Sequence, residues 1–322
     1  MEPLVTIVIA NYNKARFLGE TVMSVLSQSF TNWELIIIDD NSTDDSVAII
    51  ENQFDDKRIR LIEQKINRGA NFCRNRGIDM AKGNYLMFLD SDDLIVPDCL
   101  ERRISHLTKG DLVDFCVFTM GVFKVSIGDT NMPYWIPNSK NPLKDFLMHN
   151  LPWSILQPLW KVEFLRTLNG FDESFERLQD VELNTRALLC AKVNFKMVVT
   201  APDCYYRIAP ERRTFRTFEF LSKWMKATAR YCDKYYEIVP AGMKRFLFGT
   251  LLKSYQQLIY DLKIKAISHP EFSQLEKILF SAHIYQGASI NKKLLLKISK
   301  FYNKYIFRVP GVNRFLLMLI TT

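Results

Sequence analysis

The sequence predicts an α/β fold followed by a mostly helical C-terminal region, and three observations support this prediction. First, β-rich runs alternate with helix-like segments over the first 90 residues, which is typical of a parallel sheet with crossover helices. Second, 48% of the 322 residues are hydrophobic and 24% are charged, as in an ordinary folded protein. Third, turn signals and β-rich runs become sparse after Phe215, which favours helices. We expect one domain over residues 1–212 and a second region over residues 213–322.

The four expected strands are runs rich in β-branched and aromatic residues, at residues 5–10, 33–39, 59–64 and 85–90. Between the first two, apolar side chains recur at steps of three and four residues from Phe17 onward, which predicts one face of a helix. A second helix is expected to begin near Ser42, and a third to run from about Ala70 to Lys82. Gly83 is a suitable residue to end the third helix.

Polar residues follow each expected strand. They are Asn-Tyr-Asn at 11–13, Asp-Asp-Asn-Ser at 39–42, Asn-Arg-Gly at 67–69 and Asp-Ser-Asp-Asp at 90–93. In open parallel sheets, ligands bind beyond the carboxyl ends of the strands, because the strand-to-helix loops gather polar groups there. The sequence therefore predicts a binding site at this edge of the sheet.

The acidic run that follows the fourth strand predicts a metal site. Unpaired carboxylates of Asp90, Asp92 and Asp93 at the end of a buried strand would repel one another. Mg²⁺ or Mn²⁺ would relieve this repulsion, held by one or two carboxylates and completed by substrate phosphates and water. The alternative is a solvated acidic turn that caps the next helix. A zinc site is not expected, because the four histidines and six cysteines are scattered.

Two common phosphate-binding motifs are missing from the sequence. It contains no G-x-x-x-x-G-K-[ST] loop and no G-x-G-x-x-G after the first strand, which disfavours a P-loop enzyme or a dinucleotide-dependent dehydrogenase. Phosphates would instead be neutralised by a metal on Asp92 together with a cation such as Arg74.

Charge is unevenly distributed along the chain. Residues 211–322 carry 20 basic and 7 acidic side chains, whereas the first 210 residues carry a net charge of −5. A helical stripe of lysines beside an apolar stripe is typical of a helix on an anionic membrane surface, and a helical lid on the first domain is an equally weighted alternative. The two stripes are Lys293, Lys297, Lys300 and Lys304, and Leu294, Ile298, Phe301 and Tyr305.

The N-terminal segment has no secretory signal pattern, and no run of about 20 apolar residues is long enough to span a bilayer. The expected location is therefore the cytoplasm, with peripheral association at the inner face of the cell membrane. No nucleic-acid partner is expected.

Four blocks together resemble the family 2 glycosyltransferases of the GT-A fold, at residues 5–13, 35–44, 67–77 and 88–93. The resemblance extends to about Ala201. It implies a Rossmann-like mixed sheet with crossover helices, a nucleotide-sugar donor and Mn²⁺ or Mg²⁺. By this resemblance Asp40 accepts a hydrogen bond from the base and Asp92 ligates the metal, with Asp90 near the metal and the ribose. The implied donor-binding residues are Ala10, Tyr12, Asn13, Asp40, Asn67, Gly69, Arg74, Asp90 and Ser91.

Transfer with inversion requires a base on the face of the sugar opposite the leaving diphosphate. Residues 169–173 and 179–186 are similar to the family's G-F-D-E and E-D-x-E-L-x-x-R stretches, which makes Asp180 the candidate base. Gln179 departs from the family, where glutamate is common. The alternative role for Asp180 is to cap its helix. Further candidates for the acceptor side are Gln179, Glu182, Trp153 and Trp160.

The resemblance implies a metal-dependent inverting hexosyl- or hexosaminyltransferase of bacterial surface-polysaccharide type. Its donor would be a UDP-sugar and its acceptor a glycan or a lipid-linked glycan. Two alternatives remain open. One is a sugar-phosphate nucleotidyltransferase, which usually has a glycine-rich loop near the first strand; the other is a catalytically silent GT-A-like protein that binds membranes or anions.

Overall fold

The computed structural model describes residues 5–107, 113–208 and 217–289, together with 291, 293, 298, 316 and 318–320. The chain divides into two compact units. The first contains residues 1–140, 151–174 and 179–210, and the second contains residues 141–150, 175–178 and 211–322. Each unit is described by itself.

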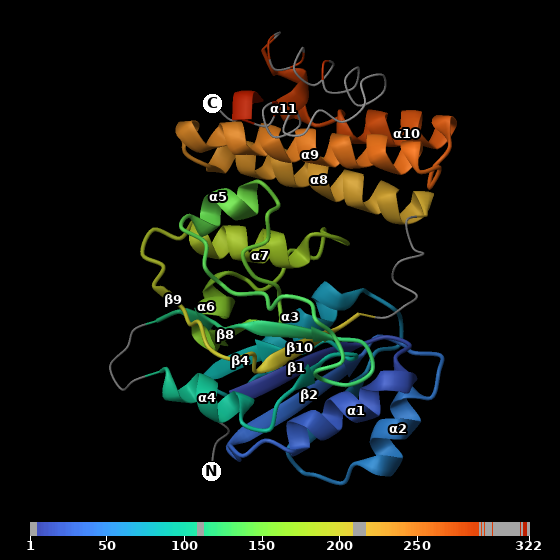
Figure 1. Cartoon of the computed structure of the whole chain (residues 1–322). Coiled ribbons are helices and arrows are strands. Elements are labelled where there is room, and N and C mark those ends of the chain that lie inside the picture. Colours follow the sequence, from blue (N-terminus) through green and yellow to red (C-terminus); the bar gives the residue numbers. More distant parts are fainter. Residues whose placement is uncertain are drawn as a thin grey trace. The chain divides into compact units, whose positions relative to one another are not determined.

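The first unit is built on a seven-stranded mixed sheet with the strand order β3-β2-β1-β4-β8-β6-β9 (Figure 1). Strand β1 pairs in parallel with β2 and β4, and β2 pairs in parallel with β3. Strand β8 runs antiparallel to both β4 and β6, so the expected mixed sheet is confirmed. The strands are β1 (Val5–Asn11), β2 (Trp33–Asp39), β3 (Ile59–Glu63), β4 (Tyr85–Phe88), β6 (Phe115–Val117), β8 (Pro158–Lys161) and β9 (Phe195–Met197).

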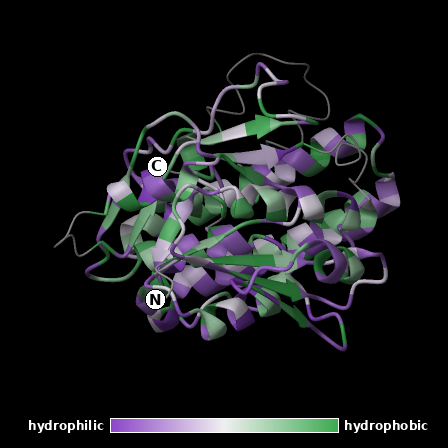
Figure 2. Cartoon of the chain, turned by 90° about the horizontal axis from the view of Figure 1, so that it is seen from below, coloured by the Kyte–Doolittle hydropathy of each residue, from purple (hydrophilic) through white to green (hydrophobic). Residues whose placement is uncertain are grey.

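Helices cover both faces of this sheet (Figure 1). Alternate side chains of β2 point to opposite faces. On one face, Leu35 and Ile37 pack in the cluster that contains Leu18 of α1. On the other face, Ile36 and Ile38 pack against Cys73 of α3. The strands are accordingly drawn mainly in the colour of hydrophobic residues in Figure 2. The helices of this unit are α1 (Ala15–Leu26), α2 (Ser46–Gln53), α3 (Ala70–Met80), α4 (Cys99–Ser105), α6 (Val162–Thr167) and α7 (Gln179–Leu188).

Helix α3 lies unusually close to β1 at Gly77. A Cβ atom added there would stand 2.3 Å from Cγ1 of Val8, far inside van der Waals contact. Only glycine allows this approach without a shift of the helix or the strand. Because Arg74 lies one turn earlier on the same helix, this packing determines where the Arg74 side chain lies at the sheet edge.

A second sheet supports the acidic segment that follows β4. Its strand order is β5-β10-β7, with β5 at Leu94–Ile95, β7 at Met120–Phe123 and β10 at Cys204–Arg207. At the end of β10, the backbone N–H of Arg207 donates to Asp93 Oδ1 over 2.8 Å, and Arg207 Nε donates to the carbonyl of Asp92 over 2.7 Å. Asp93 therefore anchors β10 and does not cap α4.

The second unit is helical in its described part, which confirms the expected helical C-terminal region. The helices are α5 (Pro142–Leu147), α8 (Phe218–Ile238), η2 (Ala241–Met243), α9 (Lys244–Lys263), α10 (His269–Leu279) and α11 (His283–Gln286). Within this unit, Thr250 of α9 donates to the carbonyl of Leu147 at the end of α5 over 2.6 Å. Ser268 and Glu271 form a capping box at the start of α10.

The expected lysine stripe and its apolar neighbour lie mostly outside the described residues. Of their eight positions, the described ones are Lys293, which donates to the carbonyl of Gln286 over 2.7 Å, and Ile298. Among the residues described, no helix has the length and apolar character needed to cross a membrane.

Candidate active site

The loops after β1 and β2 are joined by a hydrogen-bond network around Asp39. The Asp39 carboxylate accepts from the side-chain amide of Asn11 and from the hydroxyl of Ser42, both over 2.7 Å. The Ser42 hydroxyl in turn accepts from the backbone N–H of Asn13 over 2.9 Å. Asn13 and Asn41 adopt left-handed backbone conformations with φ of 50° and 64°, which asparagine tolerates better than most residues. Asp39, to which sequence reasoning gave no role, therefore shapes both loops.

Asp40 fixes the start of α3. Its two carboxylate oxygens accept from the backbone N–H groups of Arg68 and Gly69 over 2.8 and 2.7 Å, and its carbonyl accepts from the Asn67 side chain over 3.1 Å. Gly69 has a φ of 88°, a conformation that favours glycine. Asp40, Asn67 and Gly69 are thus brought together as one unit.

The surface above this unit is open at Tyr12. The Tyr12 side chain is 48% exposed, whereas Ala10 behind it is half-buried and Ser91 is buried. An exposed aromatic ring at the carboxyl end of a parallel strand is available for stacking on a planar ligand.

Arg74 and Asp90 form an ion pair between α3 and the segment after β4. Arg74 Nη2 donates to Asp90 Oδ1 over 2.9 Å, and the guanidinium lies 5.5 Å from the ring centre of Phe171. The second terminal nitrogen, Nη1, is buried and has no hydrogen-bond partner among the described residues. A buried donor without an acceptor is uncommon, so Arg74 has capacity to bind a further oxygen.

Lys14 forms an ion pair with Asp92, a contact that sequence reasoning missed. Its ammonium lies 2.7 Å from Asp92 Oδ2; the Asp92 side chain is 2% exposed and that of Lys14 is 34% exposed. The pair brings together the residue preceding α1 and the acidic segment, which are 78 positions apart in the sequence. No local sequence pattern signals such a contact, although Lys14 follows the polar residues at the end of the first strand and could have been proposed as a partner for the acidic run.

A cavity of about 160 Å³ brings Asp180 together with this group. It is lined by Arg74, Asp90, Asp93, Ser154, Ile155, Leu156, Gln179, Asp180 and Tyr206. Three acidic side chains, Asp90 and Asp93 from the acidic segment and Asp180 from the start of α7, therefore share one cavity with one arginine. Asp40 and Asp92 do not line it and lie on neighbouring loops of the same edge.

Burial raises the pKa of Asp180 above its usual value of 3.8. The backbone N–H of Val181, which donates to Asp180 Oδ1 over 2.9 Å, and the nearby Arg74 lower this pKa and offset part of the effect. Asp180 is the second residue of α7 and accepts from the next backbone N–H, which is not the capping bond of the alternative role, and it also lines the cavity. A carboxylate with a raised pKa is a stronger base.

Trp153 holds the helix that carries Asp180. Its indole N–H donates to the side-chain oxygen of Asn184 over 2.7 Å, and the Asn184 amide donates to the carbonyl of Asp180 over 2.7 Å. Trp153 is 0% exposed and Trp160 is 1% exposed. Their rings pack on Phe115, with centroids 6.2 and 4.4 Å away. The expectation that both line the acceptor side is corrected, because apolar burial places both indoles in the core.

Glu182 is also buried, and its carboxylate accepts from Arg186 over 2.6 Å. Arg186 in turn donates to the carbonyl of Gly170 over 2.8 Å. Glu182 therefore acts on the loop before α7 and does not face the cavity, unlike Gln179, which lines it.

The donor set suits a divalent cation that is completed by substrate. Among the described residues, no three His, Cys, Asp or Glu side chains are grouped to hold a metal ion. Asp90 and Asp92 supply carboxylate oxygens, which Mg²⁺ and Mn²⁺ prefer, and one or two suffice where phosphates provide the rest. The buried Asp92 is already matched by a cation, and the partly exposed Lys14 side chain has room to move away. The residues therefore fit such an ion.

Residues 6–153 match the model of glycosyl transferase family 2. The chain is 35% identical over 309 residues to the glycosyltransferase GlyG of Streptococcus pneumoniae, which covers 90% of this chain and 100% of the relative. It is 36% identical over 110 residues to the UDP-Glc:α-D-GlcNAc-diphosphoundecaprenol β-1,3-glucosyltransferase WfgD of Escherichia coli, which covers 34% of this chain. The chain spans 42–45% of the length of WfgD and two other curated relatives.

Two solved structures share the fold. The crystal structure of Staphylococcus aureus TarS 1–349 in complex with UDP-GlcNAc has a TM-score of 0.68 at 15% identity and covers 93% of this chain and 88% of that chain. The mannosyltransferase PcManGT of Pyrobaculum calidifontis, in complex with GDP-Man and Mn²⁺, has a TM-score of 0.55 at 18% identity, covering 96% and 89%. The chain therefore belongs to glycosyl transferase family 2 and is a glycosyltransferase with the GT-A fold.

Proposed function

We propose that this glycosyltransferase moves a sugar, with inversion, from a UDP-sugar to a glycan or lipid-linked glycan acceptor. The observation that carries the proposal is the cavity in which Arg74 and Asp90 face Asp180. This cavity lies at the ligand-binding edge of a parallel sheet. Arg74 supplies a cation for the leaving group, and the two carboxylates serve the sugar and the acceptor proton.

The loops after β1 to β3 provide the nucleotide site in this proposal. Tyr12, with its exposed ring, and Ala10 pack against the base and ribose. Asp40 holds the turn at Arg68 and Gly69 with one lone pair on each oxygen. The Cys73 thiol also hydrogen-bonds to this carboxylate, and Asp40 is 3% exposed. The lone pair that remains is the one proposed to accept from an imide N–H of the base. Asn13 and Ser91 complete the donor-binding set.

A divalent cation would be held by Asp92 and Asp90, and when bound it neutralises charge on the diphosphate. Lys14 and Arg74 are the chain's own cations at the same place. We propose that Lys14 moves from Asp92 to the nucleotide sugar. We also propose that the unpaired Nη1 of Arg74 donates a hydrogen bond to an oxygen of that nucleotide sugar. Mn²⁺ in the PcManGT complex supports this choice of ion.

Asp180 is the proposed base. The acceptor hydroxyl oxygen bonds to the anomeric carbon while the bond from that carbon to the diphosphate oxygen breaks, and the hydroxyl proton passes to the Asp180 carboxylate. One displacement from the opposite face inverts the configuration. The cavity of about 160 Å³ is smaller than the roughly 300–1,000 Å³ of whole-ligand sites, so it suits the reacting sugar, with the nucleotide lying outside it.

The acceptor class rests on a relative. WfgD acts on a diphosphoundecaprenol-linked sugar by its name, which supports a lipid-linked glycan of surface-polysaccharide biosynthesis as the acceptor. The peripheral membrane contact expected for the basic C-terminal helices stays a prediction, since most of that stripe lies outside the described residues.

The experiment is a panel of nucleotide sugars, with thermal stabilisation as the first readout and transfer as the second. A donor that binds the folded chain raises its melting temperature. Asp180→Asn should keep this stabilisation and lose transfer, whereas Glu163→Gln, at an 81% exposed side chain on α6, should keep both. Transfer by Asp180→Asn at the wild-type rate would remove the proposed base. Release of pyrophosphate from a nucleoside triphosphate and a sugar phosphate would instead indicate a nucleotidyltransferase.

A further inference from the structure

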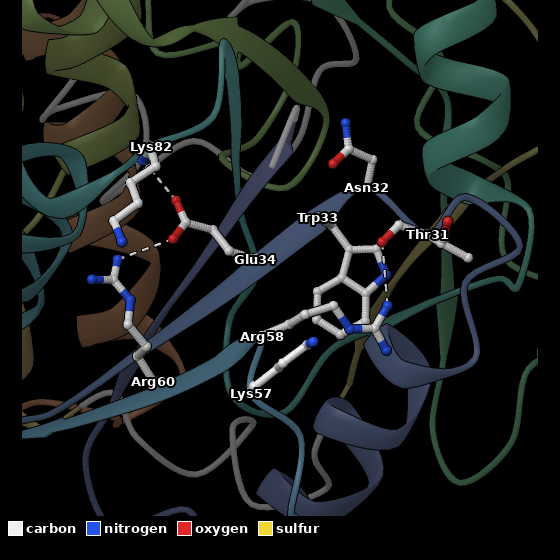
Figure 3. A pocket seen from close by; sticks show the side chains of 8 residues that line it. All are labelled: Thr31, Asn32, Trp33, Glu34, Lys57, Arg58, Arg60 and Lys82. Carbon is white, nitrogen blue, oxygen red and sulfur yellow. Dashed lines mark hydrogen bonds and ion pairs between the residues drawn. The ribbon is translucent and has the colours of Figure 1, made fainter. Parts of the chain in front are cut away.

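A second, larger pocket opens at the opposite edge of the same sheet. Its volume is about 430 Å³, and it lies where β2 and β3 begin and where the chain leaves α3 (Figure 3). Since β2 has seven residues and a strand rises about 3.3 Å per residue, roughly 20 Å separates this amino edge from the Asp39–Asp40 end. The pocket is lined by Thr31, Asn32, Trp33, Glu34, Lys57, Arg58, Arg60 and Lys82.

Two arginines of this pocket are held in place. Arg58 binds Asp56 through Nε and Nη2, and its guanidinium lies 3.8 Å from the Trp33 ring centre. Arg60 donates from Nη2 to Glu34 and to the carbonyl of Met80, both over 3.0 Å. Figure 3 shows Trp33 and Glu34 of β2, Arg60 of β3 and Arg58, which directly precedes β3, around the opening. Fixed guanidinium groups lose little entropy when a ligand binds.

The acid of the pocket is already satisfied. Glu34 is 6% exposed and accepts from the Thr6 hydroxyl over 2.8 Å, from the backbone N–H of Lys82 over 2.6 Å and from Arg60. In contrast, the ammonium groups of the exposed Lys57 and Lys82 have no hydrogen bond or ion pair within the described part of the chain. Four cations line the pocket. Arg58 is paired with Asp56 and Arg60 with Glu34, so Lys57 and Lys82 carry the unbalanced positive charge among the described residues.

Two buried donors of the same pocket also lack an acceptor. Arg60 Nε and the indole N–H of Trp33 have no hydrogen-bond partner among the described residues, and Trp33 is 1% exposed. Such groups are rare in folded proteins. Lysine ammoniums, a guanidinium and an indole N–H can only donate, so together they select a ligand that accepts several hydrogen bonds and carries negative charge.

We propose that this amino-edge pocket binds a phosphate-bearing anion. Phosphate oxygens match both the guanidinium geometry and the ammonium charges. The volume falls within the roughly 300–1,000 Å³ of small-molecule sites, which suits a diphosphate or a phosphorylated headgroup. The pocket shares no residue with the transfer site, so this inference does not depend on the proposed transfer reaction.

The test follows the Trp33 indole N–H by ¹H–¹⁵N NMR, with its signal assigned by Trp33→Phe. One arm adds inorganic pyrophosphate. The other adds vesicles of phosphatidylglycerol and phosphatidylcholine, with phosphatidylcholine vesicles as the reference and co-sedimentation as the readout. The variant is Lys57→Gln/Lys82→Gln, and the charge-matched control is Lys140→Gln/Lys192→Gln, since all four side chains are exposed. Equal melting temperatures establish that all forms are folded.

Pyrophosphate should shift the Trp33 signal, and the pocket variant should weaken this binding by about tenfold or more while the control changes it less than about twofold. If the protein binds anionic vesicles but not pyrophosphate, and only the pocket variant loses this binding, the same site is supported and the phosphate belongs to a lipid headgroup. An unmoved Trp33 signal with no vesicle binding would overturn the proposal. So would equal weakening in both double variants, because it would indicate general charge attraction.

Discussion

The two edges of one sheet carry opposite chemistry. At the carboxyl edge, carboxylates predominate and each of two is paired with a cation, Asp92 with Lys14 and Asp90 with Arg74. At the amino edge, four cations line a pocket with one acid, Glu34. The net charge of −5 over the first 210 residues hides this separation. Strand direction, and not average composition, sorts the charged residues, because each strand brings its first residues to one edge and its last to the other.

The two edges also differ in how their ion pairs are held. Lys14 is a flexible, partly exposed side chain on Asp92, so a substrate with its own cation can replace it. Arg58 is fixed by Asp56 and by the Trp33 ring, so it is preorganised. We infer that an ion pair at the carboxyl edge exchanges its partner when substrate binds, whereas the arginine at the amino edge recognises its ligand without moving.

The largest expected effect comes from removing the acid at the carboxyl edge. Asp92→Asn should reduce divalent-dependent transfer by roughly 10²–10⁴-fold, because the carboxylate proposed to hold the cation is lost. The measurement is kcat over a titration of Mn²⁺ and of Mg²⁺. Asp79→Asn, at an exposed position on α3, is the control and should keep wild-type kcat. Unchanged transfer in Asp92→Asn would remove the metal from the proposed function.

Helix α3 connects the edges, so disturbing it tests both together. Gly77→Ala places a methyl group against the stiff Val8 side chain and should lower the free energy of unfolding by about 1–3 kcal/mol through overpacking. Urea unfolding measures this change. The matched control is Gly19→Ala on α1, where the nearest atoms lie 3.6 and 3.7 Å away. It should be neutral or stabilising by up to about 1 kcal/mol. Equal effects would show that α3 tolerates displacement.

The sequence predicted the carboxyl edge well because its signals are local. The strands at residues 33–39 and 59–64 end within one residue of the observed strands, since runs of β-branched residues and the following turn residues report on their own segments. The fourth strand is two residues shorter than expected, so Asp90 lies in the loop. Arg74, Asp90 and Asp180 share one cavity and Asp40 lies on a neighbouring loop, while the roles that the resemblance gives them stay predictions.

Contacts between distant segments were the part that sequence could not supply. Arg207 meets the carbonyl of Asp92 across 115 positions, and no spacing rule reports such a pair. Trp153 was misjudged for a related reason. The sequence does not distinguish an aromatic residue that lines a site from one that is buried in the core behind it, and only the packing of Trp153 on Phe115 shows which it is. The amino-edge pocket was missed because its lining residues come from three separate segments.

The carboxyl edge should also show a pH dependence that reports on Asp180. Burial raises its pKa, and the base must be deprotonated, so kcat should fall as the pH drops through a value above the usual 3.8. Below that pKa, the rate should fall about tenfold per pH unit. The groups that face Asp180 in the cavity are Arg74, Asp90 and Asp93.

Stability gives an independent measure of the same shift. A carboxyl group with a raised folded-state pKa favours folding at low pH and loses this contribution as the pH rises through that pKa. Asp180→Asn should therefore be more stable than the wild type at neutral pH, and the difference should shrink as the pH falls. An acid limb at or below 3.8, or a stability difference independent of pH, would contradict the assignment.

The smallest expected effect tests whether Lys14 exchanges with a cation. Lys14→Met keeps most of the length of the side chain and removes its charge, so Mn²⁺ should bind a few-fold more tightly because it no longer competes with the ammonium 2.7 Å from Asp92. The effect is modest because the lysine side chain is partly exposed and screened by solvent. Mn²⁺ binding measured by electron paramagnetic resonance without donor separates this change from catalysis. Lys65→Met, which removes an exposed cation from the loop after β3, is the comparison. Weaker Mn²⁺ binding in Lys14→Met alone would mean that the lysine supports the metal site, and the distinction between an exchanging edge and a fixed one would fail.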